Sequence, residues 1–322
     1  MQMFVSRKTL KAVPGLQRAV VSARWLWRLL RLWRSRNRAF LAYRAGHPHS
    51  PLPDYADVSW ALANATAELG GLDLNVGAQI DLMRALAVYT MDHCLLEQPT
   101  EARRYHFENG FFTYPDALLL HAMLRYVRPR RVVEVGSGYS SALMLDTRDG
   151  FLDADTRFTF IDPEPRRLAS MLRPGDRQQC TILNCRIQDV GFEPFLALEA
   201  NDILFVDSSH VAKVGSDVNR IMFDVLPALQ PGVWVHLHDI FWAFEYPAGW
   251  YTAGRAWNEA YLVRAFLQYN CAFEVMLFWS YLEQQRPDLI ATLMPLARTR
   301  AGSSQNAGGS SLWLRKRAVA PT

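Results

Sequence analysis

Beyond residue 129, the chain alternates short runs of β-branched and apolar residues with stretches of helical periodicity. The strands that this pattern predicts are Arg131–Val135, Arg157–Ile161, Cys180–Asn184, Asp202–Val206, Val233–Leu237, Ala272–Phe278 and Leu312–Arg315. Strands that alternate with helices are typical of a mostly parallel sheet with helices on both faces. The sequence therefore predicts an α/β fold built on a doubly wound, seven-stranded, mostly parallel sheet.

Helical periodicity is clearest outside these strands, where apolar residues recur every three or four positions. The helices that we expect are Asp57–Gly70, Ile80–Leu96, Asp116–Val127 and Leu282–Arg298. Asp116 has the residue type of an N-cap. A loop at 301–311, in which seven of eleven residues are Gly or Ser, should be a flexible excursion before the last strand.

The first 53 residues differ in charge from the rest of the chain. They contain 11 Lys and Arg and no Asp or Glu, whereas 54–322 has a formal net charge of about −7. An acidic body argues against nucleic acid held by bulk charge. We divide the chain into a basic amphipathic helical leader and linker at 1–53, a helical cap at 54–106 and a sheet domain at 107–322.

The leader has a helical pattern at 19–43, with Arg24, Arg28 and Arg31 on one side and Trp25 and Leu29 on the other. Such a helix suits the surface of a membrane or a partner protein. It would equally suit packing on the acidic body. Arginines interrupt the apolar stretch, so it is not a signal peptide.

No stretch of the sequence has the length and apolarity of a membrane span. The four cysteines, Cys94, Cys180, Cys185 and Cys271, form no CxxC pair and no zinc-like cluster. We therefore expect a cytoplasmic protein with reduced thiols. A membrane-binding leader would place this protein at a membrane surface.

Candidate chemistry begins at the loop after the first strand. Gly136 and Gly138 allow a tight turn and close approach of a ligand to the backbone, beside a helix N-terminus with free N–H groups. A nicotinamide site would place a third glycine where this chain has Ser141. Asp162 ends the second strand and suits ribose hydroxyls, with helix capping as the alternative.

These motifs resemble those of the class I S-adenosylmethionine-dependent methyltransferases. The stretch EVGSGYSS is similar to their first motif, and Asp162 to their ribose-binding acid. The resemblance spans about Phe107 to Arg315 and includes a final antiparallel hairpin. It implies a Rossmann-like methyltransferase fold, S-adenosylmethionine as cofactor and a small-molecule acceptor. The cofactor residues that it implies, with Asp207 at the end of the fourth strand added, are Glu134, Gly136, Ser137, Gly138, Tyr139, Ser140, Ser141, Asp162, Gln188, Asp189 and Asp207.

The fourth and fifth strands lead into Asp207, His210, His238 and Asp239. The carboxyl ends of adjacent parallel strands face one crevice, so these side chains should converge beside the cofactor loop. Asp207, His238 and Asp239 could hold Mg²⁺ or Mn²⁺. Alternatively, His210, His238 and Asp239 could activate an acceptor hydroxyl without metal, or the residues could serve only as caps. The segment also resembles metal-dependent O-methyltransferases, although His238-Asp239 replaces their Asp-Asn pair.

Two further segments have open interpretations. Residues 241–261 contain eight aromatic side chains, which suit either the wall of an acceptor pocket or a packed lid. Glu108 and Asn109 could approach the amino-acid end of the cofactor or cap a local turn.

We expect an S-adenosylmethionine-dependent methyltransferase that O-methylates a small molecule. The alternatives are a catalytically inactive or membrane-tethered binding scaffold on the same fold, and a hydroxylase-like enzyme that uses iron at two His and a carboxylate. A nicotinamide oxidoreductase is disfavoured by Ser141.

Overall fold

The computed structural model describes residues 43–66, 68–93, 95–300 and 308–318. The chain divides into two compact units, residues 1–60 and 61–322. The predicted leader helix and most of the Gly/Ser-rich loop lie outside the described residues. Within the described part, every helix is too short or too polar to cross a membrane.

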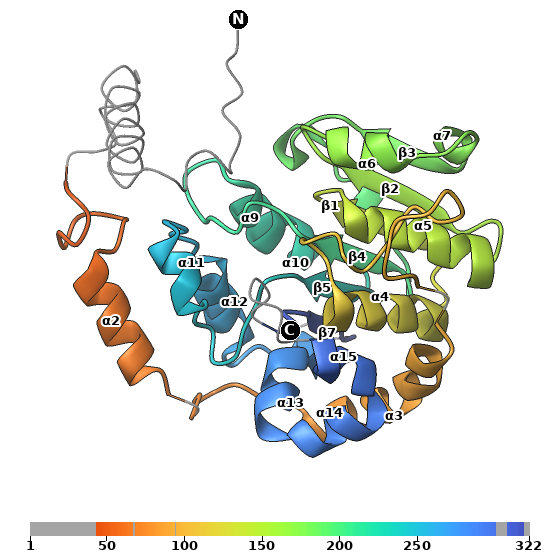
Figure 1. Ribbon diagram of the computed structural model, residues 1–322. Helices are drawn as coiled ribbons and strands as arrows, with labels where there is room; N and C mark the ends of the chain where they lie inside the picture. The colour runs from red at the N-terminus through yellow and green to blue at the C-terminus, as the bar shows by residue number, and fades with distance from the viewer. Residues whose placement is uncertain (1–42, 67, 94, 301–307, 319–322) are drawn as a thin grey trace, which may run out of the picture. The chain divides into compact units, whose positions relative to one another are not determined.

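The second unit contains one seven-stranded sheet, and the predicted fold class is confirmed. Its strands are β1 (Arg131–Val135), β2 (Arg157–Ile161), β3 (Cys180–Leu183), β4 (Ile203–Val206), β5 (Trp234–Leu237), β6 (Phe273–Phe278) and β7 (Leu312–Lys316). The order across the sheet is β3-β2-β1-β4-β5-β7-β6 (Figure 1). The strands β1 to β5 pair in parallel, whereas β7 is antiparallel to both β5 and β6.

Helix α2 (Tyr55–Asn64) spans the boundary between the two units. In the second unit, helices cover both faces of the sheet (Figure 1). They are α3 (Val76–Met91), α4 (Tyr114–Val127), α5 (Tyr139–Phe151), α6 (Arg166–Met171), α7 (Asp176–Gln179), α8 (Glu193–Leu196), α9 (Asp217–Arg220), α10 (Leu226–Ala228), α11 (Ala248–Thr252), α12 (Glu259–Leu267), α13 (Trp279–Gln285), α14 (Pro287–Leu293) and α15 (Pro295–Arg300), with a 3₁₀ turn η3 (Ile187–Asp189) and a π turn η4 (Ile221–Val225).

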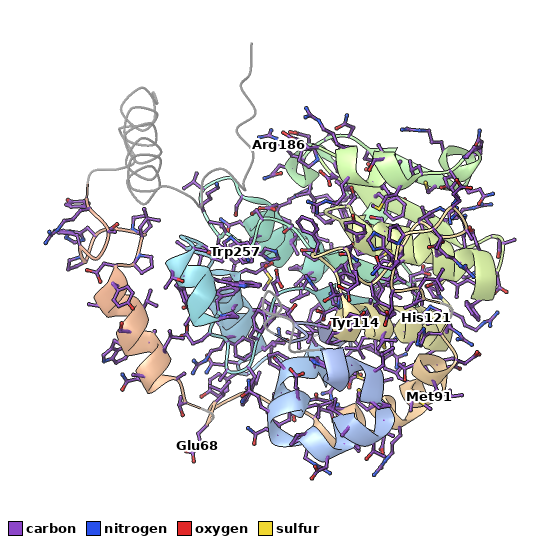
Figure 2. All side chains as sticks on the ribbon, in the orientation of Figure 1. Glu68, Met91, Tyr114, His121, Arg186 and Trp257 are labelled. Atoms are coloured by element: carbon purple, nitrogen blue, oxygen red, sulfur yellow. The ribbon has the colours of Figure 1, made fainter. Side chains whose placement is uncertain are left out.

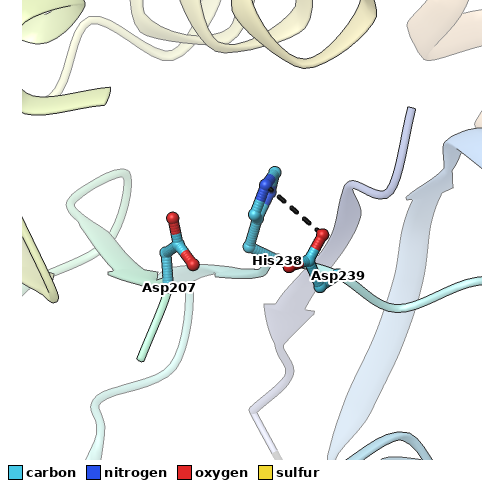
Figure 3. Close-up of side chains that lie close together, drawn as sticks. All are labelled: Asp207, His238 and Asp239. Atoms are coloured by element: carbon cyan, nitrogen blue, oxygen red, sulfur yellow. Dashed lines mark ion pairs between the residues drawn. The ribbon is translucent and has the colours of Figure 1, made fainter. Parts of the chain in front are cut away.

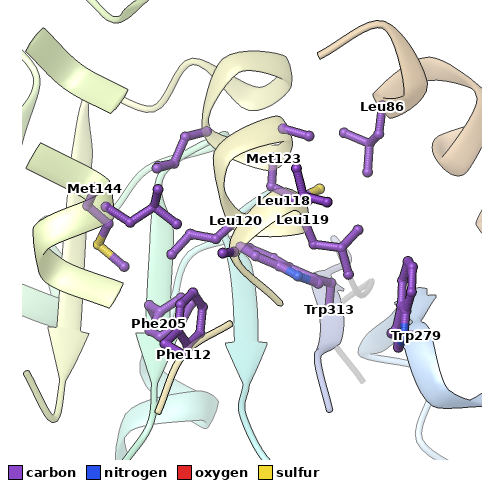
Figure 4. Packing of buried hydrophobic residues seen from close by; sticks show 14 of the residues in the cluster. Leu86, Phe112, Leu118, Leu119, Leu120, Met123, Met144, Phe205, Trp279 and Trp313 are labelled. Carbon is purple, nitrogen blue, oxygen red and sulfur yellow. The ribbon is translucent and has the colours of Figure 1, made fainter. Parts of the chain in front are cut away.

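Alternation along each strand divides the buried side chains into two cores. Phe205 of β4 belongs to the core under α3, α4 and α5, where it lies near Trp313 (Figure 4). Its neighbours Leu204 and Val206 face the opposite core, under η4 and α12. Because successive strand residues point to opposite faces, a strand covered on both sides is apolar throughout.

A buried histidine within these layers has a polar partner. His121 of α4, labelled in Figure 2, is buried and its Nδ1 lies 2.9 Å from the Thr147 hydroxyl of α5. Burial, with the nearby positive charge of Arg125, lowers the pKa of His121 to about 3. This histidine is therefore neutral and serves the packing of α4 on α5.

The prediction that Asp116 caps a helix is wrong. The helix α4 begins at Tyr114, and the extended residue Thr113 is its N-cap. Pro115 fits the first turn, where its missing N–H costs nothing. Asp116 instead lies inside the helix, where its Oδ1 accepts hydrogen bonds from the Ser310 N–H (3.0 Å) and the Ser311 hydroxyl (2.6 Å). It thereby joins α4 to the start of β7.

The other predicted helices exist, with shifted bounds. The first starts after Asp54, whose Oδ1 accepts from the Ala56 and Asp57 N–H groups, and ends at Asn64 rather than Gly70. The second, α3, runs from Val76 to Met91 rather than from Ile80 to Leu96. The insert expected at Leu282–Arg298 consists of α13, α14 and α15, because prolines at 287 and 295 each start a new helix.

Candidate functional site

A cavity of about 870 Å³ lies where β1, β2, β4 and β5 end. Eight of the eleven predicted cofactor residues line it: Gly136, Ser137, Gly138, Tyr139, Ser140, Asp162, Gln188 and Asp207. The predicted catalytic residues His210, His238 and Asp239 line it too. The topology thus brings both halves of the predicted site to one space.

The β1 loop is held by backbone bonds to both neighbouring strands. The Gly136 N–H donates to the Ile161 carbonyl, and the Asp207 N–H donates to the Val135 carbonyl, both at 2.9 Å. Gly136 has φ +85°, and a Cβ there would lie 1.8 Å from the Asp207 carbonyl oxygen. Only glycine fits this position.

Asp162 orients the loop at the end of β2. Its Oδ2 accepts from the Ser137 N–H (2.9 Å) and the Ser137 hydroxyl (2.8 Å), and its Oδ1 accepts from the Glu164 N–H (2.7 Å). The carboxylate is partly exposed to the cavity. It therefore both braces the turn and presents oxygen acceptors to a ligand.

Two predicted cofactor residues lie behind the loop rather than in the cavity. The carboxylate of Glu134 is fully buried and accepts hydrogen bonds from the hydroxyls of Ser140 (2.5 Å) and Ser141. Ser141 also accepts from the Gly138 N–H at 3.0 Å. Burial raises the pKa of Glu134 to about 8, although the two hydroxyls oppose the shift. Glu134 and Ser141 thus fix the shape of the loop.

The Glu134→Gln variant is expected to change how stability depends on pH. The unfolded pKa is 4.5 and the folded pKa about 8, so between them the folded protein keeps a proton that the unfolded chain releases. Wild-type stability should therefore fall between pH 5 and 8, by at most about 1.4 kcal/mol per pH unit. Urea unfolding at pH 6, 7 and 8 measures this loss, which the variant should lack. A control at the exposed residue Glu164, Glu164→Gln, should keep the wild-type profile, and the same profile in Glu134→Gln would contradict the prediction.

Of the two residues after β3 that were predicted to contact adenine, Gln188 lines the cavity and Asp189 does not. Gln188 lines the cavity and its Nε2 donates to the Gly215 carbonyl at 2.8 Å. Asp189 points to solvent and forms a two-bonded ion pair with Arg186, both bonds at 2.9 Å. Asp189 therefore does not line the cavity, while Arg186, labelled in Figure 2, does.

Asp207, His238 and Asp239 form a compact cluster across the ends of β4 and β5 (Figure 3). Each offers a ligand atom, and the three atoms lie within 4.8 Å of one another. The parallel register pairs Val206 with Leu237, so the residues that follow them are neighbours. Asp239 has φ +58° and its Oδ1 accepts from the Ser310 hydroxyl at 2.9 Å.

His210 is surrounded by carboxylates. Its Nδ1 lies 2.8 Å from Glu259, and its Nε2 lies 3.4 Å from Asp207 and 3.5 Å from Asp239. Burial disfavours the charged ring, but these carboxylates prevail and raise the pKa of His210 well above its ordinary value. The ring is therefore an imidazolium near neutral pH, which is poorly suited to the predicted role of general base.

The charges of the other cluster members follow from the same balance. Burial opposes ionisation of Asp207, but His238 and His210 prevail and lower its pKa to about 2. Burial likewise opposes a charge on His238, whose pKa is nevertheless raised by Asp239 and Asp207. The His238 Nδ1 lies 3.4 Å from the Nε2 of His236, whose pKa burial lowers well below the ordinary value.

The structure shows where the aromatic segment 241–261 and the pair Glu108 and Asn109 lie. In the aromatic segment, Trp250 and Trp257 line the cavity, whereas Trp242 and Phe244 are buried in the core, so the segment is both pocket wall and packed lid. Asn109 does not reach the cavity. Its Oδ1 accepts from two N–H groups of the adjacent turn, and Glu108 accepts from the Tyr114 hydroxyl at 2.7 Å.

Sequence reasoning missed several residues of the site. Glu259, Phe111, Arg167 and Arg255 belong to it or support it. Arg167 follows Asp162 by five positions, and Arg255 and Glu259 lie within the aromatic segment at 241–261, but none of the three was singled out. Nothing in the sequence connects Glu259 to His210, which is 49 positions away.

Part of this chain is similar to known proteins. Residues 133–240 match the family model of a methyltransferase domain. An uncharacterized protein of Archaeoglobus fulgidus is 29% identical over 167 residues, which cover 49% of this chain and 74% of that protein.

Solved structures are also similar to this chain, among them those of two methyltransferases. The O-methyltransferase TomG from Streptomyces achromogenes, in complex with S-adenosylmethionine, is 16% identical, with 82% of this chain and 97% of that chain covered and a TM-score of 0.38. The Podospora anserina methyltransferase PaMTH1, bound to S-adenosylhomocysteine, is 13% identical, with 80% and 93% covered and a TM-score of 0.42. The family match covers most of the strands and loops that build the cavity, and this part of the chain is therefore similar to a methyltransferase domain.

Proposed function

We propose that this protein transfers the methyl group of S-adenosylmethionine to a hydroxyl oxygen of a small molecule. The observation that carries the proposal is that the β1 loop and the cluster of Asp207, His238 and Asp239 line the same cavity. The first suits the cofactor, and the second suits a hydroxyl that must lose a proton. A cavity of about 870 Å³ has room for both molecules.

The cofactor would lie along the ends of β1, β2 and β3. The N-terminus of α5 and the backbone of the β1 loop would face its amino-acid end. Asp162 would accept hydrogen bonds from the ribose hydroxyls, and Gln188 would lie beside the adenine. The methyl group would then point toward the ends of β4 and β5.

In the transfer, the acceptor oxygen forms a bond to the methyl carbon while the bond from that carbon to sulfur breaks. S-adenosylhomocysteine leaves, and the hydroxyl proton must be taken up. Carboxylates raise the pKa of both histidines, but they raise that of His210 well above its ordinary value, so His238, whose Nε2 lies 3.7 Å from Asp239, is the better candidate for this step. In-line placement of the oxygen supplies much of the rate enhancement.

The cluster also fits a divalent cation. Two carboxylates and one imidazole within 4.8 Å match the ligand preferences of Mn²⁺ and, through the oxygens, of Mg²⁺. Asp207, His238 and Asp239 would hold the ion. When bound, it would supply a positive charge that lowers the pKa of the acceptor hydroxyl.

Calorimetric titration tests the cofactor and metal together. We expect S-adenosylmethionine to bind and NADH not to bind, because Ser141 replaces the third glycine of a nicotinamide loop. We expect Mg²⁺ or Mn²⁺ to bind wild-type protein at a 1:1 ratio and Asp207→Asn at least tenfold more weakly, since one of two carboxylates is lost.

Three outcomes of these experiments would contradict parts of the proposal. Failure of S-adenosylmethionine to bind would overturn the methyltransferase proposal and favour a scaffold. Binding of the methyl donor without any metal binding would overturn the metal site alone and leave transfer by His238 and Asp239. Activity that follows iron and oxygen instead of the methyl donor would favour the hydroxylase alternative.

A further inference from the structure

Arg255 lines the cavity from the segment that joins α11 to α12. Its guanidinium carbon lies 4.6 Å from the ring centre of Trp250 and 5.1 Å from that of Trp257. Its backbone N–H donates to the Trp250 carbonyl at 3.0 Å, which closes the segment around the two rings. Trp257 is labelled in Figure 2. The cation is therefore stacked on the aromatic wall of the cavity.

Within the described residues, no carboxylate pairs with Arg255. Arg186 lines the same cavity but is committed to Asp189 through two hydrogen bonds. Arg167 stacks on Phe111 at 3.8 Å and approaches Gly138, so it belongs to the cofactor end. A guanidinium stacked through its face keeps its in-plane N–H groups free, and these match a carboxylate in two parallel bonds.

The aromatic wall connects this cation to the reacting groups. Trp257 lies 4.4 Å from the ring of His210 and 5.1 Å from Arg255, so one indole separates the guanidinium from that histidine. The His210 Nε2 in turn lies 3.4 Å from Asp207 and 3.5 Å from Asp239. Trp250 packs edge to face on Trp257, with ring centres 5.0 Å apart. A flat molecule along this wall would have one end near the acidic cluster and the other near Arg255.

Charge supports the same orientation. The carboxylates of Asp162, Asp207, Asp217 and Asp239 line the cavity and would repel an anion, and Lys213 lines it besides the three arginines. Arg255 offers an anionic group a favourable place away from them. A neutral acceptor forms no ion pair with this cation and gains less from it.

We propose that Arg255 determines acceptor specificity, selecting a flat, hydroxylated aromatic ring that carries a carboxylate. The ring packs on Trp250 and Trp257, the carboxylate pairs with the guanidinium, and the hydroxyl reaches the acidic cluster. This inference rests on the proposed function, since it concerns the acceptor half of the same cavity.

Two probes of matched size test it: 3,4-dihydroxybenzoate, which is an anion, and 3,4-dihydroxybenzyl alcohol, which is neutral. Calorimetry with S-adenosylhomocysteine present measures their binding without turnover. Wild-type protein should bind the benzoate roughly tenfold more tightly, the scale of one charge-assisted hydrogen-bonded pair. In Arg255→Gln, the benzoate should lose this advantage, while binding of the alcohol should change less than twofold.

The controls separate charge from packing. Arg255→Lys keeps the charge and should retain part of the preference. Arg128→Gln removes an exposed cation that pairs with Asp153, and should bind both probes as wild type does.

Equal loss of both probes in Arg255→Gln, or no preference in wild type, would overturn the inference. Methyl transfer to either probe, followed in the same samples with S-adenosylmethionine, tests the proposed function separately. Transfer without preference would contradict only the role of Arg255, whereas preference without transfer would contradict only the proposed activity.

Discussion

Replacing Gly136 by alanine is expected to lower the affinity for S-adenosylmethionine at least 100-fold, about 3 kcal/mol, and to lower the melting temperature. The added Cβ would lie 1.8 Å from the Asp207 carbonyl oxygen, far inside contact distance. The neighbouring atom is backbone, and φ is +85°, a region costly for any other residue. The β1 loop must therefore move away from β4, and the cofactor would lose the turn that faces it.

A matched control lies two residues further on. Gly138 has an extended backbone, and a Cβ there would meet the side chain of Arg167 at 3.2 Å, which is flexible and can move. Gly138→Ala should therefore keep the melting temperature of wild type. Calorimetry and thermal unfolding of both variants decide the matter. A Gly136→Ala protein with wild-type stability and affinity would mean that the loop does not have this conformation.

The sheet was predictable because its strands are covered on both faces. The β4 run Ile203–Val206 is apolar at each position, since its alternate side chains enter two different cores. Proline and glycine residues mark the ends of most of these elements. The single helix expected at Leu282–Arg298 was wrong, because the prolines at 287 and 295 divide it into separate helices. Hydrophobic periodicity alone does not take account of these prolines.

The acidic cluster was predictable from topology. Asp207 and His238 directly follow the neighbouring parallel strands β4 and β5, so their convergence needs only the sheet order. Asp116 could not be placed in the same way. Its partners Ser310 and Ser311 lie 194 and 195 positions away, and a local rule for helix caps was the only available guide.

For the β1 loop, the sequence identified the right residues but did not reveal which groups their side chains contact. Glu134 and Ser141 stand inside the first motif, yet they bond to each other behind it. A strand position gives the face on which a side chain lies, not what it meets there. Glu259 and Arg255 were missed because their roles depend on how the segment after β5 folds back over the cavity.

Asp239→Ala is expected to reduce methyl transfer at least 1,000-fold while changing the affinity for S-adenosylmethionine less than threefold. The variant removes a carboxylate beside His238 and His210, at the end of the cavity that we assign to the acceptor. No contact of Asp239 in the described structure involves the β1 loop or Asp162.

Asp239→Asn is the sharper variant, because Asp239 has φ +58° and asparagine tolerates this conformation better than alanine does. Its amide oxygen can still accept from the Ser310 hydroxyl, so the fold should be kept while the charge is lost. Both variants should transfer methyl groups equally poorly if the charge is what matters. Asp153→Asn, which removes an exposed carboxylate paired with Arg128, should retain full activity. Initial rates and calorimetry on the four proteins measure this, and equal losses of rate and cofactor affinity would mean that Asp239 only supports the structure.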